Sequence, residues 1–346
     1  NYISVLTKTK IQNMTKIKYT KDYNEIFNIK KNFYDENKKN YKKIIKVNKR
    51  YIKQPLRKKC KICLTKLPKK IFYQHLINYT ICKKCGHLNG LHEDTLKFTK
   101  WLYEDRKGKN YSSGYTKNFD KRVKNIYLPK ANFLKSIIKS KIKLLDIGSG
   151  AGHFLKALEI KKINSLGLEP NETLVNLGNR KLKKNILLKT DEKYFKNKIL
   201  EKNNYNVMSL IAVLEHLNDP HSILKSFLKS KIKYLYISVP LFSLSTFLEN
   251  SFQKIFPRHL GGAHTHLFTE QSINYLKKKY KLKSVGEWWF GTDFPDLYRS
   301  ILNSSTYFKN QYVDHLDKNL FSVINKLQNV LDKNKICSEV HLILKK

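Results

Sequence analysis

The stretch LLDIGSGAGHF, at residues 144–154, constrains the fold of this chain more than any other. A short apolar run leads through Asp146 into a glycine-rich turn, and helix-forming sequence follows. Glycine is required where the backbone takes a positive φ or must approach a ligand closely. The alternative is an ordinary turn between a strand and a helix. The stretch predicts a strand, a turn that cradles a ligand and a helix, with the glycines at Gly148, Gly150 and Gly152.

Strand-like and helix-like segments alternate from residue 141 onward. Amphipathic segments of helical period separate apolar runs of strand length, a pattern typical of a doubly wound α/β fold with a mostly parallel, Rossmann-like sheet. The apolar runs are 142–148, 163–170, 185–191, 205–216, 232–240, 282–290 and 339–346. We therefore predict a seven-stranded sheet.

The spacing of the glycines separates two classes of cofactor. A dinucleotide fingerprint that starts at Gly148 requires Gly or Ala at the position of His153. The alternating D-x-G-x-G-x-G form instead resembles the first motif of class I S-adenosylmethionine-dependent methyltransferases. This resemblance spans about 141–290 and implies that the last strand, 339–346, is antiparallel. It also implies that S-adenosylmethionine is bound by Asp146, Gly148, Ser149, Gly150, Gly152, Glu169 and Asp191.

Acidic residues at two strand ends fit this resemblance. Glu169 ends the second predicted strand, where a carboxylate can accept both ribose hydroxyl protons. Its alternative is a surface acid. Asp191 falls where the family places a residue near the adenine. The segment LEHLNDP follows the fourth strand and is widespread in the family, and its Glu215 and His216 lie where open α/β sheets bind ligands.

Four cysteines form a C-x2-C-x18-C-x2-C pattern, which is typical of a zinc ribbon. Four thiolates fill a tetrahedral shell and leave no position for substrate, so the zinc is expected to be structural. The alternatives are two disulfides or free thiols. The predicted ligands are Cys60, Cys63, Cys82 and Cys85, and Cys337 remains unpaired.

The ribbon narrows the resemblance. Followed by the connector at 102–115 with its YSSGY and by amphipathic lead-in helices, it looks like the sugar methyltransferases of deoxysugar and surface-polysaccharide pathways. The chain divides into a basic arm (1–55), the ribbon (56–95), a connector with lead-in helices (96–140) and the methyltransferase domain (141–346). The resemblance implies methyl transfer to a sugar nucleotide or glycan precursor.

The segment RHLGGAHTHLFTEQS, at 258–272, supplies candidate bases. The related C-methyltransferases read approximately Tyr-His-Glu-His-Leu here; this chain lacks the Tyr and Glu, which favours transfer to oxygen or nitrogen. In an extended segment His264 and His266 share a face, and an imidazole suits a general base. Structural histidines or a three-histidine metal site are the alternatives. His259 is expected at the surface, and Gly261 and Gly262 would let the loop move.

The formal net charge of +42 raises the question of a polyanionic partner. The chain has 62 lysines, 7 arginines and only 5 alanines, a bias typical of AT-rich coding sequence. We therefore read the charge as mainly a solvated lysine surface. Two rivals remain: an RNA methyltransferase that grips phosphates with its ribbon and basic arm, and a non-catalytic ribbon protein with a vestigial cofactor fold. No apolar run near residue 1 has signal-peptide length, so a cytoplasmic enzyme is expected.

Overall fold

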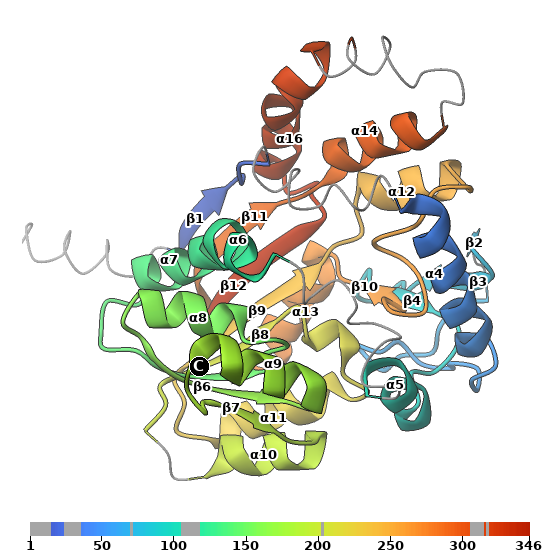
Figure 1. The fold of residues 1–346 in the computed structure, drawn as a ribbon. Helices are drawn as coiled ribbons and strands as arrows, with labels where there is room; N and C mark the ends of the chain where they lie inside the picture. Colours follow the sequence, from blue (N-terminus) through green and yellow to red (C-terminus); the bar gives the residue numbers. More distant parts are fainter. Residues whose placement is uncertain are drawn as a thin grey trace, which may run out of the picture.

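An α/β domain and a smaller ribbon-like sheet make up the computed structural model (Figure 1). It describes residues 15–23, 36–69, 72–104, 118–201, 204–304, 315 and 318–346. The YSSGY of the predicted connector and the start of the basic arm lie outside these residues.

The main sheet has the order β1-β11-β12-β9-β8-β5-β6-β7. The five adjacent strands β9, β8, β5, β6 and β7 pair in parallel. Strand β12 lies between β9 and β11 and runs antiparallel to both. All seven predicted strands are present, and the antiparallel last strand is confirmed. Their bounds are β5 Lys143–Ile147, β6 Asn164–Glu169, β7 Leu187–Lys189, β8 Val207–Ile211, β9 Tyr234–Pro240, β11 Lys283–Phe290 and β12 Glu339–Lys345.

An eighth strand, β1 (Lys16–Tyr19), pairs in parallel with β11 at the sheet edge. The prediction of seven strands was therefore one short. Three of its four residues are exposed, so the sequence KIKY carries no buried alternation that would mark a strand. The Trp288 indole donates to the Thr20 carbonyl over 2.7 Å, which ties the end of β1 to β11. Part of the basic arm thus belongs to the main domain.

Helices cover both faces of the sheet, and each face has its own apolar core. On one face lie α6 (Phe119–Arg122), a π-helical turn η3 (Val123–Tyr127), α7 (Leu128–Ile137), α8 (His153–Ile160) and α9 (Glu172–Leu182). On the other lie α10 (Glu192–Leu200), α11 (Pro220–Lys229) and α13 (Glu270–Lys279). Beyond β11 follow α14 (Asp293–Ser304), η5 (Phe321–Val323) and α16 (Ile324–Lys333). The predicted lead-in helices are therefore present.

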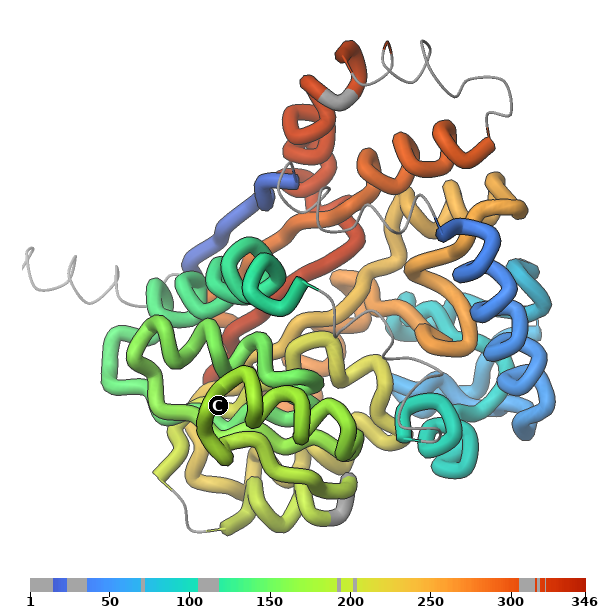
Figure 2. Tube along the Cα trace, in the orientation of Figure 1, coloured from blue at the N-terminus to red at the C-terminus, as the bar shows by residue number. Residues whose placement is uncertain are grey.

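A second sheet has the order β10-β4-β3-β2 and pairs antiparallel throughout. Its strands are β2 (Phe72–Gln74), β3 (Ile77–Ile81), β4 (Leu88–Gly90) and β10 (His266–Leu267). The first three come from the ribbon, but β10 comes from the histidine-rich loop after β9, as the adjoining cyan and orange segments of Figure 2 show. Helices α4 (Asn37–Tyr51) and α5 (Leu96–Tyr103) share an apolar core with this sheet.

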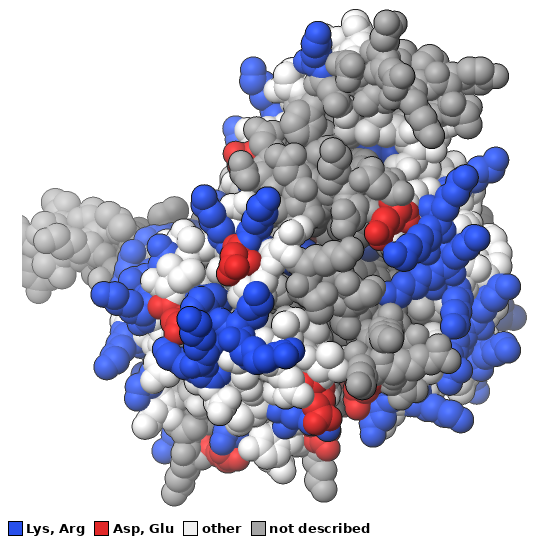
Figure 3. Space-filling view, viewed as in Figure 1, with Lys and Arg blue, Asp and Glu red and all other residues white. Residues whose placement is uncertain are grey.

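Lysine and arginine side chains spread over the face drawn in Figure 3, with smaller groups of Asp and Glu among them. Helix α4 is a dense source of this charge, and most of its lysines are exposed. Among the described residues, no helix combines the length and the apolar character needed to cross a membrane.

Candidate active site

The glycine loop joins β5 to α8 with three left-handed residues. Gly148, Gly150 and Gly152 have φ of +70°, +56° and +76°. A Cβ on Gly148 would lie 2.6 Å from Cγ2 of Val213, so a side chain there is excluded by packing as well as by φ. A Cβ on Gly150 would meet nothing within 4 Å, so this backbone borders open space. The loop therefore presents bare backbone to a ligand.

Two buried carboxyl groups flank the loop. Asp146 accepts a hydrogen bond from the Ser209 hydroxyl over 2.6 Å, and burial raises its pKa to about 6. Glu169 accepts from the amides of Gly150 (2.8 Å) and Asn171 (3.0 Å), and burial raises its pKa to about 7. Each Glu169 oxygen keeps a further lone pair, so the carboxylate fits two ribose hydroxyl groups once it is ionised.

The remaining predicted cofactor residues have local structural roles. The Ser149 hydroxyl donates to the Asp146 carbonyl over 3.0 Å, within the loop. Asp191 is exposed and caps α10, accepting from the Tyr194 amide over 2.7 Å. It follows β7, which pairs with β6 up to Glu169, so both acids lie at the same sheet edge. A cleft of about 1030 Å³, lined by Asn171 and other polar residues, opens beside this edge.

The segment after β8 brings Glu215 and His216 next to the glycine loop. Both lie in a short 3₁₀ turn, η4 (Leu214–His216), and Val213 just before it packs against Gly148. The imidazole of His264 stacks on that of His216, with ring centroids 4.9 Å apart. Burial raises the pKa of Glu215 to about 8 and lowers that of His264 to about 4. The structure thus brings three predicted catalytic residues together.

Tyr103 links the two halves of this site, and no sequence motif indicated this residue. Its carbonyl accepts from the Asn171 side chain over 2.8 Å, two residues beyond Glu169. Its hydroxyl lies 2.8 Å from His216 Nδ1 and donates to the Ala263 carbonyl over 3.2 Å. One residue, through its backbone carbonyl and its side-chain hydroxyl, therefore connects the strand end that carries Glu169 with the histidine-rich loop.

A chain of hydrogen bonds favours one tautomer of His266. The Ser272 hydroxyl donates to the Thr269 carbonyl over 3.0 Å, so it has no proton left for His87. The tautomer of His87 that fits this arrangement donates from Nδ1 to Ser272 Oγ (3.4 Å) and accepts at Nε2 from His266 Nδ1 (2.8 Å). His266 Nε2 is left as an acceptor. It is buried and has no hydrogen-bond partner among the described residues.

The two candidate bases contact different partners. His264 precedes β10 and stacks on His216, whereas His266 lies within β10 and contacts His87 of the ribbon. Burial lowers the pKa of His266 and of His87 well below the ordinary value, so both rings are neutral at pH 7. His87 is a second residue that sequence reasoning missed, although it directly follows the Cys85-Gly86 turn.

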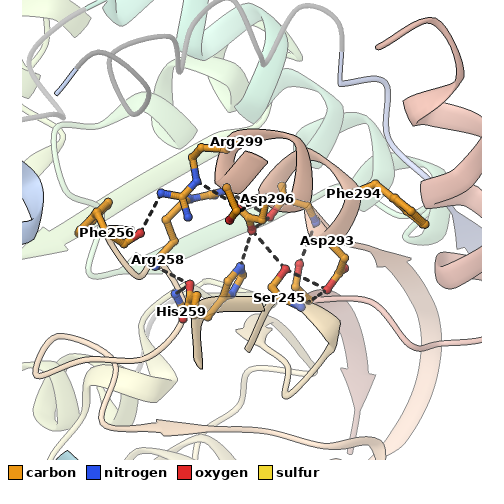
Figure 4. Close-up of polar contacts among 12 residues, drawn as sticks. Ser245, Phe256, Arg258, His259, Asp293, Phe294, Asp296 and Arg299 are labelled. Atoms are coloured by element: carbon orange, nitrogen blue, oxygen red, sulfur yellow. Dashed lines mark hydrogen bonds and ion pairs between the residues drawn. The ribbon is translucent and has the colours of Figure 1, made fainter. Parts of the chain in front are cut away.

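His259 is not a surface residue, contrary to expectation. It is buried, and its Nε2 lies 3.0 Å from Asp296 Oδ2 on α14 (Figure 4). Asp296 also pairs with Arg258 Nη1 at 2.6 Å. The carboxylate of Glu249, on α12 (Leu244–Ser251), accepts the backbone amides of residues 258, 259 and 260. This buried network anchors the first half of the histidine-rich loop.

The glycines of this loop serve packing and not bending. A Cβ on Gly262 would lie 2.6 Å from Val47 Cγ1, and the Gly262 amide donates to the Asn48 side chain over 2.7 Å. Gly261 packs similarly against Ile44, and neither glycine has a positive φ. The expectation of a hinge at these positions was therefore wrong, because helix α4 lies directly against them.

The four cysteines of the ribbon form one buried cluster without a disulfide. The Sγ atoms lie 3.6 Å apart for Cys60 and Cys85 and 3.3 Å apart for Cys63 and Cys82, and all four lie within 4.8 Å of one another. A tetrahedral zinc with Zn–S bonds of about 2.3 Å requires Sγ separations of about 3.8 Å. The donor set and its spacing fit such an ion.

Comparison with known proteins agrees with the methyltransferase prediction that the glycine loop suggested. Residues 119–285 match a family model described as a methyltransferase domain. This range includes the loop, Glu169 and the LEHLNDP segment. The chain has the class I S-adenosylmethionine-dependent methyltransferase fold, and the prediction that it is a methyltransferase enzyme is confirmed. No curated protein matches the sequence.

Several solved structures are similar in fold. A SAM-dependent methyltransferase from Archaeoglobus fulgidus is 20% identical with a TM-score of 0.40, covering 66% of this chain and 98% of its own. Magnesium protoporphyrin IX methyltransferase from Synechocystis PCC 6803 is 11% identical with a TM-score of 0.42, covering 66% and 88%. The plantazolicin methyltransferase BpumL is 16% identical with a TM-score of 0.43, covering 72% and 93%.

Proposed function

We propose that this enzyme transfers a methyl group from S-adenosylmethionine to a hydroxyl or amine of a sugar nucleotide or glycan precursor. The observation that carries the proposal is His266 Nε2, a buried acceptor without a hydrogen-bond partner among the described residues. An acceptor hydroxyl has to lose its proton during transfer, and an oriented imidazole can take it.

The donor side is assigned to the residues that flank the glycine loop. When bound, S-adenosylmethionine supplies an electrophilic methyl group carried on a sulfonium. Glu169 would hold the ribose hydroxyls, Asp191 would lie on the adenine side, and the remaining contacts would come from Asp146, Gly148, Ser149, Gly150 and Gly152. The Glu169 carboxylate already fixes the Gly150 amide over 2.8 Å, which keeps the loop in shape before the ligand arrives.

The acceptor side combines several buried groups. His266 would accept the proton at Nε2, held in that tautomer by His87. Glu215, His216 and His264 would surround the acceptor and exclude water. Enclosure matters because methyl transfer depends on aligning the two reactants in a dry site.

The ribbon is proposed to hold a structural Zn²⁺ through Cys60, Cys63, Cys82 and Cys85. It also supports the choice of substrate class, because a cysteine ribbon before the methyltransferase domain resembles sugar methyltransferases. The absence of Tyr and Glu from the Ala263–Leu267 motif favours oxygen or nitrogen over carbon as the acceptor.

The test is product analysis by mass spectrometry. The full chain is incubated with labelled S-adenosylmethionine and a sugar-nucleotide extract of the source organism, and labelled products are identified. His266→Ala should lower turnover by about 10²- to 10⁴-fold and leave cofactor affinity unchanged. His315→Ala, which removes an exposed histidine, is the matched control. Unaltered turnover in His266→Ala would show that His266 is not the general base.

One observation favours RNA as a second candidate substrate. A groove of about 280 Å³ is lined by Lys46, Lys49, Arg50, Lys53 and Trp101, and the Arg50 guanidinium lies 4.5 Å from the Trp101 ring centre. Cations beside an aromatic ring suit phosphates and a stacked base. Labelled RNA in the same incubation, with binding that falls steeply with salt, would favour this candidate over the sugar.

A further inference from the structure

Three side chains beside the proposed acceptor site have the arrangement of metal ligands. One ligand atom each of Glu215, His216 and His264 lies within 4.8 Å of the other two. They come from η4 and from the loop before β10, so the cluster joins two separate segments. The four-cysteine cluster is distinct from it, because none of its ligands is shared.

The Glu215 carboxyl group is buried and incompletely satisfied. Its side chain is 1% exposed, and Oε2 has no hydrogen-bond partner among the described residues. Burying such a group without a partner costs free energy, so its environment favours a ligand that can contact this oxygen. Oε1 lies 4.0 Å from His216 Nε2. These two atoms are not hydrogen-bonded to each other, because 4.0 Å exceeds hydrogen-bond range.

Tyr103 orients the His216 imidazole beside Glu215. The Tyr103 hydroxyl has a single proton, which it donates to the Ala263 carbonyl over 3.2 Å. The same hydroxyl lies 2.8 Å from His216 Nδ1, which holds the ring with its Nε2 on the side of Glu215. Histidines that bind metals commonly donate their second nitrogen to an oxygen in this way. The Glu215 carboxyl group and the His216 imidazole thus lie beside each other.

We propose that Glu215, His216 and His264 bind a divalent first-row cation, Mn²⁺ or Zn²⁺. Two imidazoles and one carboxylate suit these ions. Three protein ligands leave coordination positions open, in contrast to the closed four-cysteine shell. This site rests on the proposed function for its role, in which the cation coordinates the acceptor oxygen. Coordination lowers the pKa of a bound hydroxyl, and its proton passes to His266 Nε2.

Manganese titration of the full chain tests the site separately from activity. Mn²⁺ prefers oxygen and imidazole ligands, so it reports on this cluster and leaves the cysteines to zinc. Free Mn²⁺ is measured by electron paramagnetic resonance, and a parallel sample is loaded with Zn²⁺ and its metal content determined. The wild type should bind one Mn²⁺ per chain. In the zinc sample it should bind two Zn²⁺ per chain, whereas the four cysteines alone account for one.

Variants assign the binding to these ligands. Glu215→Gln and His264→Gln should abolish it, and Tyr103→Phe should weaken it by about 10-fold or more, because the orientation of His216 is lost. Glu270→Gln, which removes an exposed carboxylate on α13, should bind like the wild type. Thermal melting and S-adenosylmethionine affinity establish that each variant is folded.

The outcomes separate the cation site from the proposed function. Stoichiometric binding that is lost in Glu215→Gln supports the site even if no sugar is methylated. A wild type that binds no Mn²⁺ and only one Zn²⁺ overturns it, whatever the enzyme methylates. Binding that persists in both ligand variants also overturns it, because the ion then lies elsewhere.

Discussion

The pKa of Glu169 should make cofactor affinity depend on pH. Burial is the main cause that raises this pKa to about 7, and only the ionised carboxylate can accept both ribose protons. Because the folded-state pKa lies above the ordinary value, the neutral acid persists up to neutral pH and competes with binding. If only the ionised form binds, the apparent Kd scales as 1 + 10^(pKa − pH). Affinity should then fall about 10-fold, or about 1.4 kcal/mol, from pH 8 to pH 6.

Isothermal titration calorimetry at pH 6, 7 and 8 measures this effect. The amino group of S-adenosylmethionine titrates in the same range, so the relevant quantity is the difference between wild type and Glu169→Gln. The variant should bind more weakly at pH 8 and show only the pH dependence of the ligand. Asp191→Asn, at an exposed strand end, should keep the wild-type dependence. Equal pH dependence in wild type and Glu169→Gln would refute the assignment of the ribose to this carboxylate.

Further predictions concern the glycine loop, the ribbon and their contacts. Gly148→Ala should weaken cofactor binding and lower the free energy of unfolding more than Gly150→Ala does. Both variants incur left-handed backbone strain of about 1–2 kcal/mol, but only the new Cβ at position 148 meets Val213. Urea denaturation compares the unfolding free energies of the two variants. His87→Phe should lower kcat at least about 10-fold with cofactor affinity unchanged, and ¹⁵N NMR of His266 should show a changed tautomer; an unchanged spectrum would contradict the hydrogen-bond chain. Asp94→Asn should cost about 3–5 kcal/mol of unfolding free energy, because Asp94 is a buried partner of Arg57 and Lys61; a loss below 1 kcal/mol by denaturant titration would argue against this role.

The sequence predicted the donor half of the site because that half is local. Asp146, the glycines and Glu169 lie at strand ends, and strand ends follow from apolar runs and from glycines that break them. The structure confirms the strands. It also gives Asp191 a local role as a helix cap, which any Asp before a helix can have.

The acceptor half depends on contacts that sequence spacing does not contain. Tyr103 and His216 are 113 residues apart, and His87 and His266 are 179 apart. Neither partner lies in a periodic pattern that indicates the other. His259 was misassigned for the same reason, because its buried partner Asp296 lies on a helix 37 residues later. Strand β10 has only two residues, which is too short for alternation to mark it.

The shared sheet changes what the cysteine ribbon does for the enzyme. If the four thiolates bind the proposed zinc, they fill its coordination shell, and the ribbon then contributes no open metal position. Yet β4 pairs with β10, and His87 holds His266 in the tautomer that leaves Nε2 as the acceptor. If the proposed zinc is bound, its removal should unfold strands that β10 requires as partners. The glycine loop, on the far side of Tyr103, should be affected less. Chelation should therefore lower turnover before it lowers cofactor affinity. Activity assays and calorimetry on the chelated protein check that order. Simultaneous loss of turnover and of cofactor affinity would mean that the ribbon only stabilises the whole fold.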